Sequence, residues 1–494
     1  MVELTQGQTV DATGAGESVH ASPRKSAFTV ATLAALSTVS FALFWLPLRP
    51  EAFGANAIVL MCLMMMLRVP LAMALLVPSL GGLYALGNGR VVENVLGSLP
   101  YDTVTSWSLS VLPMFILMGM LMWQSGLTQD LFRAANTWLG WLPGGLAVGT
   151  NLAGTGLGAV SGSSSSVTYA LTRIGVPEMI KAGYSNRLAL GSVIVASLPG
   201  QLIPPSILLV LYAGVVEANV GQVLLAGVGP GLFISVMFTL MLIGFAVVER
   251  RSSPSSAVTS TWQERFSSSS KVWPLPVLVV IVVGGVFSGI FTATEAGAAA
   301  ALFSAIILFV WRRKQGDALS SFASACVGTV TSVGTIFLLL VGVGALGQML
   351  NLSGISTLLA NGVENLDLGR VGFLLLMMVI YLFLGAFMET LPMMVLTIPV
   401  LMPTLANLDV SLLWYGAFIV LMGEIGMITP PVGILTMIIY TIVREPEVNC
   451  GRAISLKDIW IAALWYLPLA IVVVVTLIFF PGIATWLPSV AGRG

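Results

Sequence analysis

The sequence contains two Pro-Pro pairs, each at the end of an apolar segment that begins with small residues. One segment covers residues 157–205 and the other covers residues 385–431. Lipid offers no partner to backbone amides and carbonyls, so a helix broken at membrane depth must be covered by protein or must line a water-filled cavity. Discontinuous helices of this kind are typical of ion and substrate sites in secondary transporters.

The two segments belong to an internal duplication. The motif Leu-Gly-Ala occurs at 157–159 and again at 384–386, and the Pro pairs occur at 204–205 and 430–431. Upstream, Ser-Gly followed by Leu or Ile occurs at 125–127 and at 353–355. The separation between the two copies is nearly the same for all of these motifs, which indicates two related halves, each with one broken helix.

The composition identifies the class of protein. Of 494 residues, 57% are hydrophobic and only 9% are charged, and the mean hydropathy is +0.98, whereas soluble domains carry about 25% charged residues. The chain is therefore expected to be a polytopic membrane protein, and its net charge of zero suggests no nucleic-acid partner.

Few residues suit enzyme chemistry. The three cysteines lie far apart, and the one histidine, His20, falls in a polar N-terminal stretch, which argues against a metal site and a histidine-based enzyme. No phosphate-binding loop motif is present, so ATP is not the expected driving force. We expect a transporter with no cofactor other than a coupling ion.

We predict an all-α polytopic membrane protein built as an inverted repeat, with five spans and one re-entrant hairpin in each half. The predicted segments are a disordered cytoplasmic tail at 1–26, an extra N-terminal transmembrane helix at 27–48, a first half at 54–248 with a hairpin at 144–180 and a broken helix at 185–216, a cytoplasmic linker at 249–272, and a second half at 273–482 with a hairpin at 371–404 and a broken helix at 412–443. Amphipathic stretches at 126–141 and 353–364 suit helices lying in the membrane interface.

The distribution of positive charge gives the orientation. With the N-terminus in the cytoplasm, only Arg49, Arg90, Arg370 and Arg493 of the 21 Lys and Arg residues lie outside. Because cytoplasmic loops are enriched in Lys and Arg, this arrangement is favoured. Five spans per half is an odd number, so the second half is expected to be inverted and the C-terminus periplasmic.

The first hairpin tip is rich in serine, from Ser161 to Ser166. Its hydroxyls and exposed carbonyls would ligate a hard cation such as Na⁺, and its free amides would meet an anion. The alternative is close helix packing, for which Gly and Ser are suited in membranes. In the following break, Gly200 and Gln201 are candidates for cation or substrate contact, unless the break is a proline kink without a ligand.

Two acidic residues of the second half, Glu389 and Glu424, fall at membrane depth beside Thr390 and Thr429. Acidic side chains are unfavourable in the bilayer, so a functional role is the default hypothesis. Each carboxylate could neutralise a cation or hold a structural hydrogen-bond network. Glu295 begins a predicted helix, where stabilisation of the helix N-terminus is the simpler explanation.

Several motifs, in order through both halves, resemble the large membrane subunit of tripartite ATP-independent periplasmic (TRAP) transporters. The resemblance covers about residues 54–482 and is carried by LPGGLAVGTNLAGTGLGAVSGSSSSV, IGVPEMIKAGYSNRLA, LIPPSILLVLYAG, AGVGPGL, TATEAG and EIGMITPPVG. It implies an elevator-type carrier in a bacterial or archaeal inner membrane, driven by Na⁺ and importing organic acids, mostly carboxylates.

The resemblance also implies partners. These are a small four-helix membrane subunit and a soluble periplasmic substrate-binding protein. Because only one predicted helix, 27–48, precedes the core, we expect the small subunit to be a separate chain. The mobile unit of the carrier would comprise 144–216 and 371–443, and the apolar spans 223–248 and 273–291 would belong to a static scaffold.

By position, the resemblance implies two Na⁺ sites with substrate between them. Sodium ligands would be Ser161, Gly162, Ser163, Ser164, Gly200, Ile203, Gly385, Glu389, Thr390, Gly426 and Thr429. Substrate contacts would be Ser165, Ser166, Gln201, Pro204, Pro205, Pro430 and Pro431, with Glu424 and Glu295 in structural or charge-neutralising roles. The chain departs from the family pattern at 198–201, where small residues and Gly are usual, at Glu389, where Asp is usual, and at Pro392, which is an addition.

An alternative hypothesis from the residues is a self-sufficient Na⁺/anion symporter that shares the duplicated plan but needs no binding protein. A channel or membrane scaffold is a further alternative, but a channel would not need a Pro-broken helix in each half.

Overall fold

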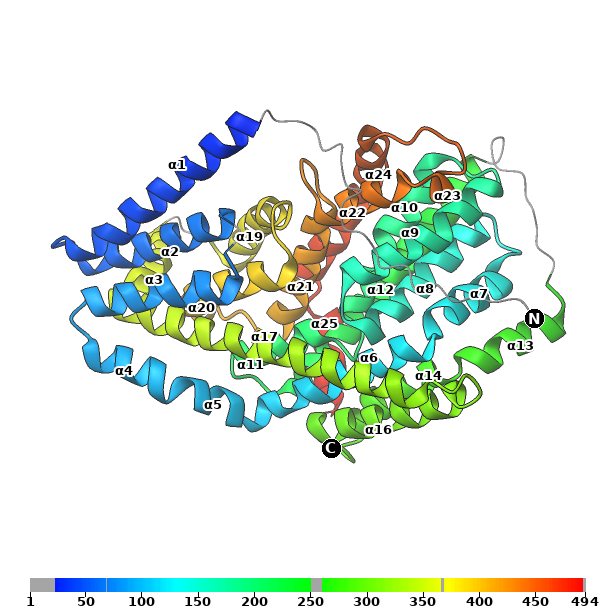
Figure 1. Ribbon diagram of the computed structural model, residues 1–494, viewed down its shortest axis with the longest axis horizontal. Helices are drawn as coiled ribbons and strands as arrows, with labels where there is room; N and C mark the ends of the chain where they lie inside the picture. Colours follow the sequence, from blue (N-terminus) through cyan, green and yellow to red (C-terminus); the bar gives the residue numbers. More distant parts are fainter. Residues whose placement is uncertain (1–22, 68, 250–259, 366–367, 492–494) are drawn as a thin grey trace, which may run out of the picture.

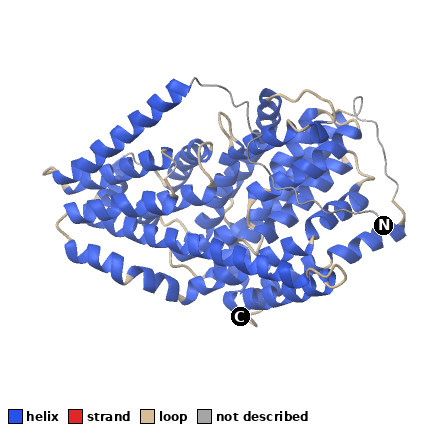
Figure 2. Ribbon diagram, viewed as in Figure 1, coloured by secondary structure: helices blue, strands red, loops and turns tan. Residues whose placement is uncertain are grey.

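The computed structural model describes residues 23–67, 69–249, 260–365 and 368–491, and within them every regular element is a helix (Figure 2). Up to the linker the helices are α1 (Pro23–Ala42), η1 (Leu43–Trp45), α2 (Pro50–Met66), α3 (Leu71–Ala85), α4 (Gly89–Gly97), α5 (Leu99–Thr105), η2 (Trp107–Ser110), α6 (Val111–Ser125), α7 (Leu127–Leu139), α8 (Gly145–Ser161), α9 (Ser164–Lys181), α10 (Asn186–Ala196), η3 (Pro199–Gln201), α11 (Ile207–Val215) and α12 (Val220–Val248).

The later helices are α13 (Trp262–Val272), α14 (Pro274–Val279), η4 (Val280–Gly284), α15 (Gly285–Phe287), α16 (Ala293–Arg312), α17 (Ala318–Ser353), α18 (Ile355–Asn365), α19 (Arg370–Gly385), α20 (Thr390–Asn407), α21 (Leu412–Ile428), α22 (Ile434–Val443), α23 (Pro446–Asn449), α24 (Leu456–Phe479) and α25 (Gly482–Ala491). The segments α14, η4 and α15 follow one another without a gap and contain one π-helical stretch.

Five of these helices are long and apolar enough to cross a membrane, and the number rises to seven if each of two bent helix pairs forms one span. The five are α12, α16, α17, α20 and α24. A full crossing needs about 20 apolar residues. Shorter apolar helices include α19, α21 and α22, which belong to the second hairpin and the second broken helix.

One packed group of helices surrounds α17, which at 36 residues extends from beside α3 to beside α6 (Figure 1). It packs against α2, α3 and α6, and α16 lies against α6. Small residues allow close approach here, as at Gly342, where an added Cβ would lie 2.9 Å from the Leu75 side chain. These helices therefore join the two halves of the chain in one frame.

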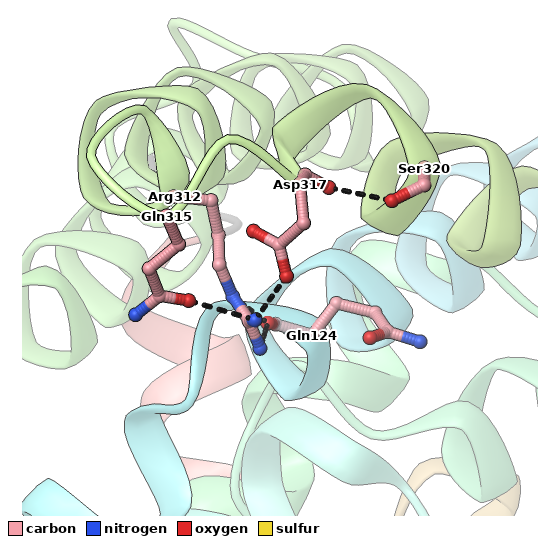
Figure 3. A network of polar contacts seen from close by, with 5 residues as sticks. All are labelled: Gln124, Arg312, Gln315, Asp317 and Ser320. Atoms are coloured by element: carbon pink, nitrogen blue, oxygen red, sulfur yellow. Dashed lines mark hydrogen bonds and ion pairs between the residues drawn. The ribbon is translucent and has the colours of Figure 1, made fainter. Parts of the chain in front are cut away.

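Within this group, the turn between α16 and α17 is hydrogen-bonded to the end of α6. Arg312 donates to the backbone carbonyl of Gln124 at 2.7 and 3.0 Å, and it also contacts Asp317 at 2.7 Å and Gln315 at 2.9 Å (Figure 3). The last carbonyls of a helix lack partners within the helix, so an arginine suits this position.

A second packed group contains both hairpins and both broken helices. Helix α8 packs against α9 and α10, and α21 packs against α19, α20 and α24. Helix α12 also belongs here, because it contacts α8, α11 and α21, and Asn151 of α8 donates to Thr239 of α12 at 3.1 Å. The stretch 223–248, predicted to belong to a static scaffold, thus packs against the hairpin group, and whether it is static stays a prediction.

Some elements differ from the sequence-based boundaries. Helices α4 and α5 form short segments within the predicted first half, and α25 begins at Gly482, where the predicted second half ends. Helix α1 begins before the expected 27–48 helix and ends at Ala42. Residues 1–22 of the predicted tail and 250–259 of the predicted linker lie outside the described residues. The rest of the linker includes α13, which packs on α7.

Candidate functional site

The first hairpin turns between α8 and α9 over two residues. Gly162 ends α8 in the left-handed region, at φ 62°, where glycine is favoured. Ser163 is the N-cap of α9, and its hydroxyl accepts from the amide of Ser166 at 3.3 Å. Ser161 accepts from the amide of Ser163 at 3.4 Å. The serine run is therefore a tight helix-to-helix turn whose hydroxyls cap its own backbone.

The first break lies directly against this hairpin. Between α10 and α11 the chain passes through η3 and the Pro204-Pro205 pair. A Cβ added at Gly200 would lie 2.5 Å from the carbonyl oxygen of Thr155 and 2.7 Å from the Cα of Gly158. Only glycine permits this backbone approach. Gly158 was not predicted as a site residue, although the repeated Leu-Gly-Ala motif pointed to it.

The second half repeats this packing at corresponding positions. A Cβ added at Gly426 would lie 2.5 Å from the Cα of Gly385, and one added at Gly385 would lie 2.7 Å from the Cα of Gly426. The amide of Gly433, after the second break, donates to the carbonyl of Ala386 at 3.1 Å. Both Pro pairs, 204–205 and 430–431, are cis. In each half the region of the break thus packs against the end of the first hairpin helix, which is α8 in the first half and α19 in the second.

Glu424 connects the two hairpin tips. Its side chain, on α21, is 1% exposed. Thr390, the first residue of α20, donates to one carboxylate oxygen at 2.9 Å, and Ser164, the first residue of α9, donates to the other. The carboxylate therefore lies between the N-terminal ends of two helices, where partial positive charge and hydroxyl donors favour an anion.

Glu389 extends the same group of contacts. It is the N-cap residue of α20, and its exposed carboxylate lies 3.5 Å from the hydroxyl of Ser165. Consecutive serines of the first tip, Ser164 and Ser165, thus face Glu424 and Glu389 of the second half. None of the three ion pairs found among the described residues involves either carboxylate. Two acids and several hydroxyls converge here without a basic partner, an arrangement suited to a cation.

Gln201 occupies the first tip. It is 0% exposed, and the surrounding hydrogen-bonding groups select one orientation of its amide. In that orientation its oxygen accepts from the amides of Ser163 and Ser164 at 3.2 Å each, and its nitrogen donates to the carbonyl of Gly162 at 3.3 Å. The amide therefore satisfies both the donors and the acceptor that the turn presents.

The remaining predicted site residues differ in how far they are buried. Pro204 and Pro205 are buried and Ile203 is half-buried, whereas Pro431 is exposed. The Thr429 hydroxyl donates to the carbonyl of Ile425 at 2.8 Å, within its own helix. Ser166 is exposed on α9. The first break is thus more enclosed than the second.

Glu295 belongs to a different structural feature. It forms a capping box with Thr292 at the start of α16, accepting from the Thr292 amide at 2.8 Å and hydroxyl at 2.9 Å. This is the local stabilisation expected at a helix N-terminus. The structure therefore does not bring Glu295 to the two tips.

Comparison with known proteins gives the family. A family model described as the DctM component of the tripartite ATP-independent periplasmic transporter matches residues 58–483. The C4-dicarboxylate TRAP transporter large permease protein DctM of Pseudomonas aeruginosa is 32% identical over 397 residues, which cover 79% of this chain and 88% of that protein. The ectoine TRAP transporter large permease protein TeaC of Halomonas elongata is 29% identical over 431 residues, which cover 87% of this chain and 97% of that protein.

A solved structure shares the fold. The YdaH transporter of Alcanivorax borkumensis superposes with a TM-score of 0.56 at 15% identity, over 80% of this chain and 89% of that chain. The two proteins therefore share a fold although their sequences have little in common. Together with the family match over residues 58–483, the helical hairpins, the broken helices and the apolar spans establish that this multi-pass membrane protein belongs to the DctM family, the large membrane subunit of TRAP transporters.

Proposed function

We propose that the chain imports a small organic acid, coupled to Na⁺, as the membrane carrier of a tripartite system. The carrying observation is the meeting of Glu389 and Glu424 with the hydroxyls of Ser164, Ser165 and Thr390. The two carboxylates accept from consecutive serines of the first tip, Ser164 and Ser165. A hard cation prefers oxygen ligands of this kind, and Na⁺ bound there would supply the compensating positive charge.

The proposed partners follow from the family. A periplasmic binding protein would deliver the substrate, and a small four-helix membrane subunit would be a separate chain. Relatives carry the names of C4-dicarboxylate, ectoine and sialic acid transporters, so a carboxylate-bearing substrate is proposed here. The proposed orientation places the N-terminus in the cytoplasm and the C-terminus in the periplasm of an inner membrane, as the positive charges favour.

We further propose an elevator motion between the two packed groups of helices. The moving unit would contain the hairpins, the broken helices and α12, and the static frame would contain α2, α3, α6, α16 and α17. Support comes from the extensive packing inside each group. Between the groups lies a cavity of about 670 Å³, lined by residues of α5, α11, α17 and α20. Alternating access by rigid-body movement of one unit needs such a boundary.

The coupling is tested in proteoliposomes containing this chain, its small subunit and a candidate binding protein loaded with a C4-dicarboxylate, ectoine or sialic acid. We expect uptake to require both the binding protein and an inward Na⁺ gradient. Uptake unaffected by replacing Na⁺ with choline would contradict the coupling. Uptake that needs no binding protein would favour the self-sufficient symporter instead.

The motion is tested with disulfides in a background lacking Cys62, Cys326 and Cys450. A Cβ at Gly347 of α17 would lie 4.0 Å from the Cβ of Pro399 on α20, within the range for a disulfide. Oxidising Gly347→Cys with Pro399→Cys should stop uptake, and reduction should restore it. As a control inside the unit, Thr155→Cys with Ser235→Cys joins α8 to α12, where the native hydroxyls are 3.4 Å apart. Uptake that survives the first cross-link would exclude the motion.

A further inference from the structure

The first tip contains a side chain that competes with any ion for the same backbone groups. The carbonyl of Gly162 is the acceptor that a cation would use at this turn, and it already receives a hydrogen bond from Gln201. The amides of Ser163 and Ser164, which a cation cannot satisfy, donate to the oxygen of the same side chain. Gln201 is 0% exposed, and its backbone carbonyl accepts a hydrogen bond from the Ser206 hydroxyl. Both the side chain and the backbone of Gln201 are therefore fixed by hydrogen bonds.

The second tip has no such side chain. When the two Pro pairs are aligned, Gln201 corresponds to Met427, whose buried side chain has no strong hydrogen-bonding group. The same alignment relates Ser163 to Glu389 and Ser164 to Thr390. The first half therefore has a neutral amide, Gln201, within its tip, whereas the second half has methionine at that position and a carboxylate, Glu389, at the position of Ser163.

We propose that the amide of Gln201 replaces a cation at the first tip, so that this tip binds no Na⁺ and ion binding is confined to the carboxylates of Glu389 and Glu424. This inference rests on the proposed Na⁺ coupling and concerns the number of ions. A primary amide has two donors and an acceptor, so it satisfies a turn that presents both a carbonyl and two amides. A bound cation would satisfy the carbonyl alone. The Ser163 amide would keep the Ser161 hydroxyl as an acceptor, but the amide of buried Ser164 would lose the Gln201 oxygen, which is unfavourable.

The consequence is a first hairpin whose tip is complete in the absence of Na⁺. Gln201 is part of the chain, so its amide neither dissociates nor responds to the ion gradient. Na⁺ would then act on the second hairpin, and through Glu424 on the contact between the tips. The residues predicted from the family resemblance to bind Na⁺ at the first tip would form a permanent structural turn.

The test measures ions bound, independently of transport. The purified full-length chain in detergent is unfolded by heat at increasing Na⁺, with choline holding the ionic strength constant, since a ligand that binds only the folded state raises stability with its concentration. The slope of stability against the logarithm of Na⁺ concentration gives the number of ions. We expect about one ion for the wild type and about two for Gln201→Ala, whose vacated site exposes the Gly162 carbonyl.

Two further variants keep the result interpretable. Met427→Ala makes the corresponding truncation in the second half and should not add an ion. Gln201→Glu keeps the side-chain length but loses the donor to Gly162, so it should show an added Na⁺ dependence even if the alanine variant fails to fold. A wild type that binds two ions, or Gln201 variants that gain no Na⁺ dependence, would overturn the inference. A wild type whose stability and uptake ignore Na⁺ altogether would instead overturn the proposed coupling.

Discussion

The two hairpin tips share a backbone arrangement but differ in the chemistry of their side chains. In both halves a pair of glycines, Gly158 with Gly200 and Gly385 with Gly426, brings the break against the hairpin. The first tip is satisfied by the buried amide of Gln201, whereas the second carries the exposed carboxylate of Glu389. Two segments with the same glycine packing therefore carry different side-chain chemistry.

The carboxylate of Glu424 has no counterpart in the first half. In the alignment of the two Pro pairs its position is taken by Leu198, which is completely buried. One acid therefore receives hydroxyl donors from both tips, Ser164 on one side and Thr390 on the other. The charged carboxylate thus belongs to the second half, but residues of both halves donate hydrogen bonds to it.

The largest effect is expected from Glu424→Gln, because it removes the charge that both tips share. Hydrogen bonds to charged groups contribute about 1.5–3 kcal/mol, so uptake should fall by about ten- to a hundredfold. The measurement is the initial rate of uptake in proteoliposomes at matched protein content. Glu295→Gln, which changes an exposed capping residue, is the control and should leave uptake near the wild-type rate. Normal uptake by the Glu424 variant would remove the basis of the comparison.

The glycine contacts are expected to be equivalent in the two halves. A methyl group at Gly200 would lie 2.5 Å from the Thr155 carbonyl oxygen, and one at Gly426 would lie 2.5 Å from the Gly385 Cα. Overpacking of this kind costs about 1–3 kcal/mol, so both alanine variants should unfold at clearly lower temperature. Gly244→Ala, with no atom within 4 Å of the added methyl, is the control. If only one of the two alanine variants lost stability, the glycine contacts of the two halves would not be equivalent.

A smaller effect on uptake is expected from removing either of the two hydroxyls that donate to Glu424. Ser164→Ala and Thr390→Val each remove one donor and leave the other in place. The other hydroxyl keeps the carboxylate paired, so each variant should reduce uptake less than Glu424→Gln does, by roughly two- to tenfold. Because the hydroxyls share a partner, the double variant should deviate from additivity. An effect of Thr390→Val with none of Ser164→Ala would mean that the first tip acts independently of Glu424.

The smallest effect is expected from the ion pair that joins the halves away from the tips. Arg173 of α9 contacts the carboxylate of Glu445 at 2.6 and 2.7 Å, with both side chains nearly half-exposed. Exposed pairs contribute about 0–1 kcal/mol. Arg173→Ala should therefore lower the unfolding temperature only slightly, and less at high salt, where the charges are screened. A double-mutant cycle with Glu445→Ala measures the pair, and a large coupling would show that the halves are held together here rather than at Glu424.

Much of the candidate site was accessible to local reasoning. The serine run predicted a hairpin turn, and the Pro pairs predicted breaks, because proline lacks an amide hydrogen and disrupts the preceding helical turn. The structure has a two-residue turn at Gly162 and Ser163 and unwound segments at both Pro pairs. The capping role favoured for Glu295 also follows from its neighbours in sequence. Each of these features depends on residues within a few positions of one another.

Hydrophobic length, proline and repeated motifs are local properties, so they predict an apolar helical membrane protein with a broken helix in each of two similar segments. Tertiary packing brings Ser164 and Thr390 together on Glu424, although these residues are far apart along the chain and carry no mutual signal. It also decided that Gln201 faces the first tip and that α12 packs with the hairpins. The physical reason is that local patterning specifies whether a residue avoids water, whereas packing between distant helices specifies which residue becomes its neighbour.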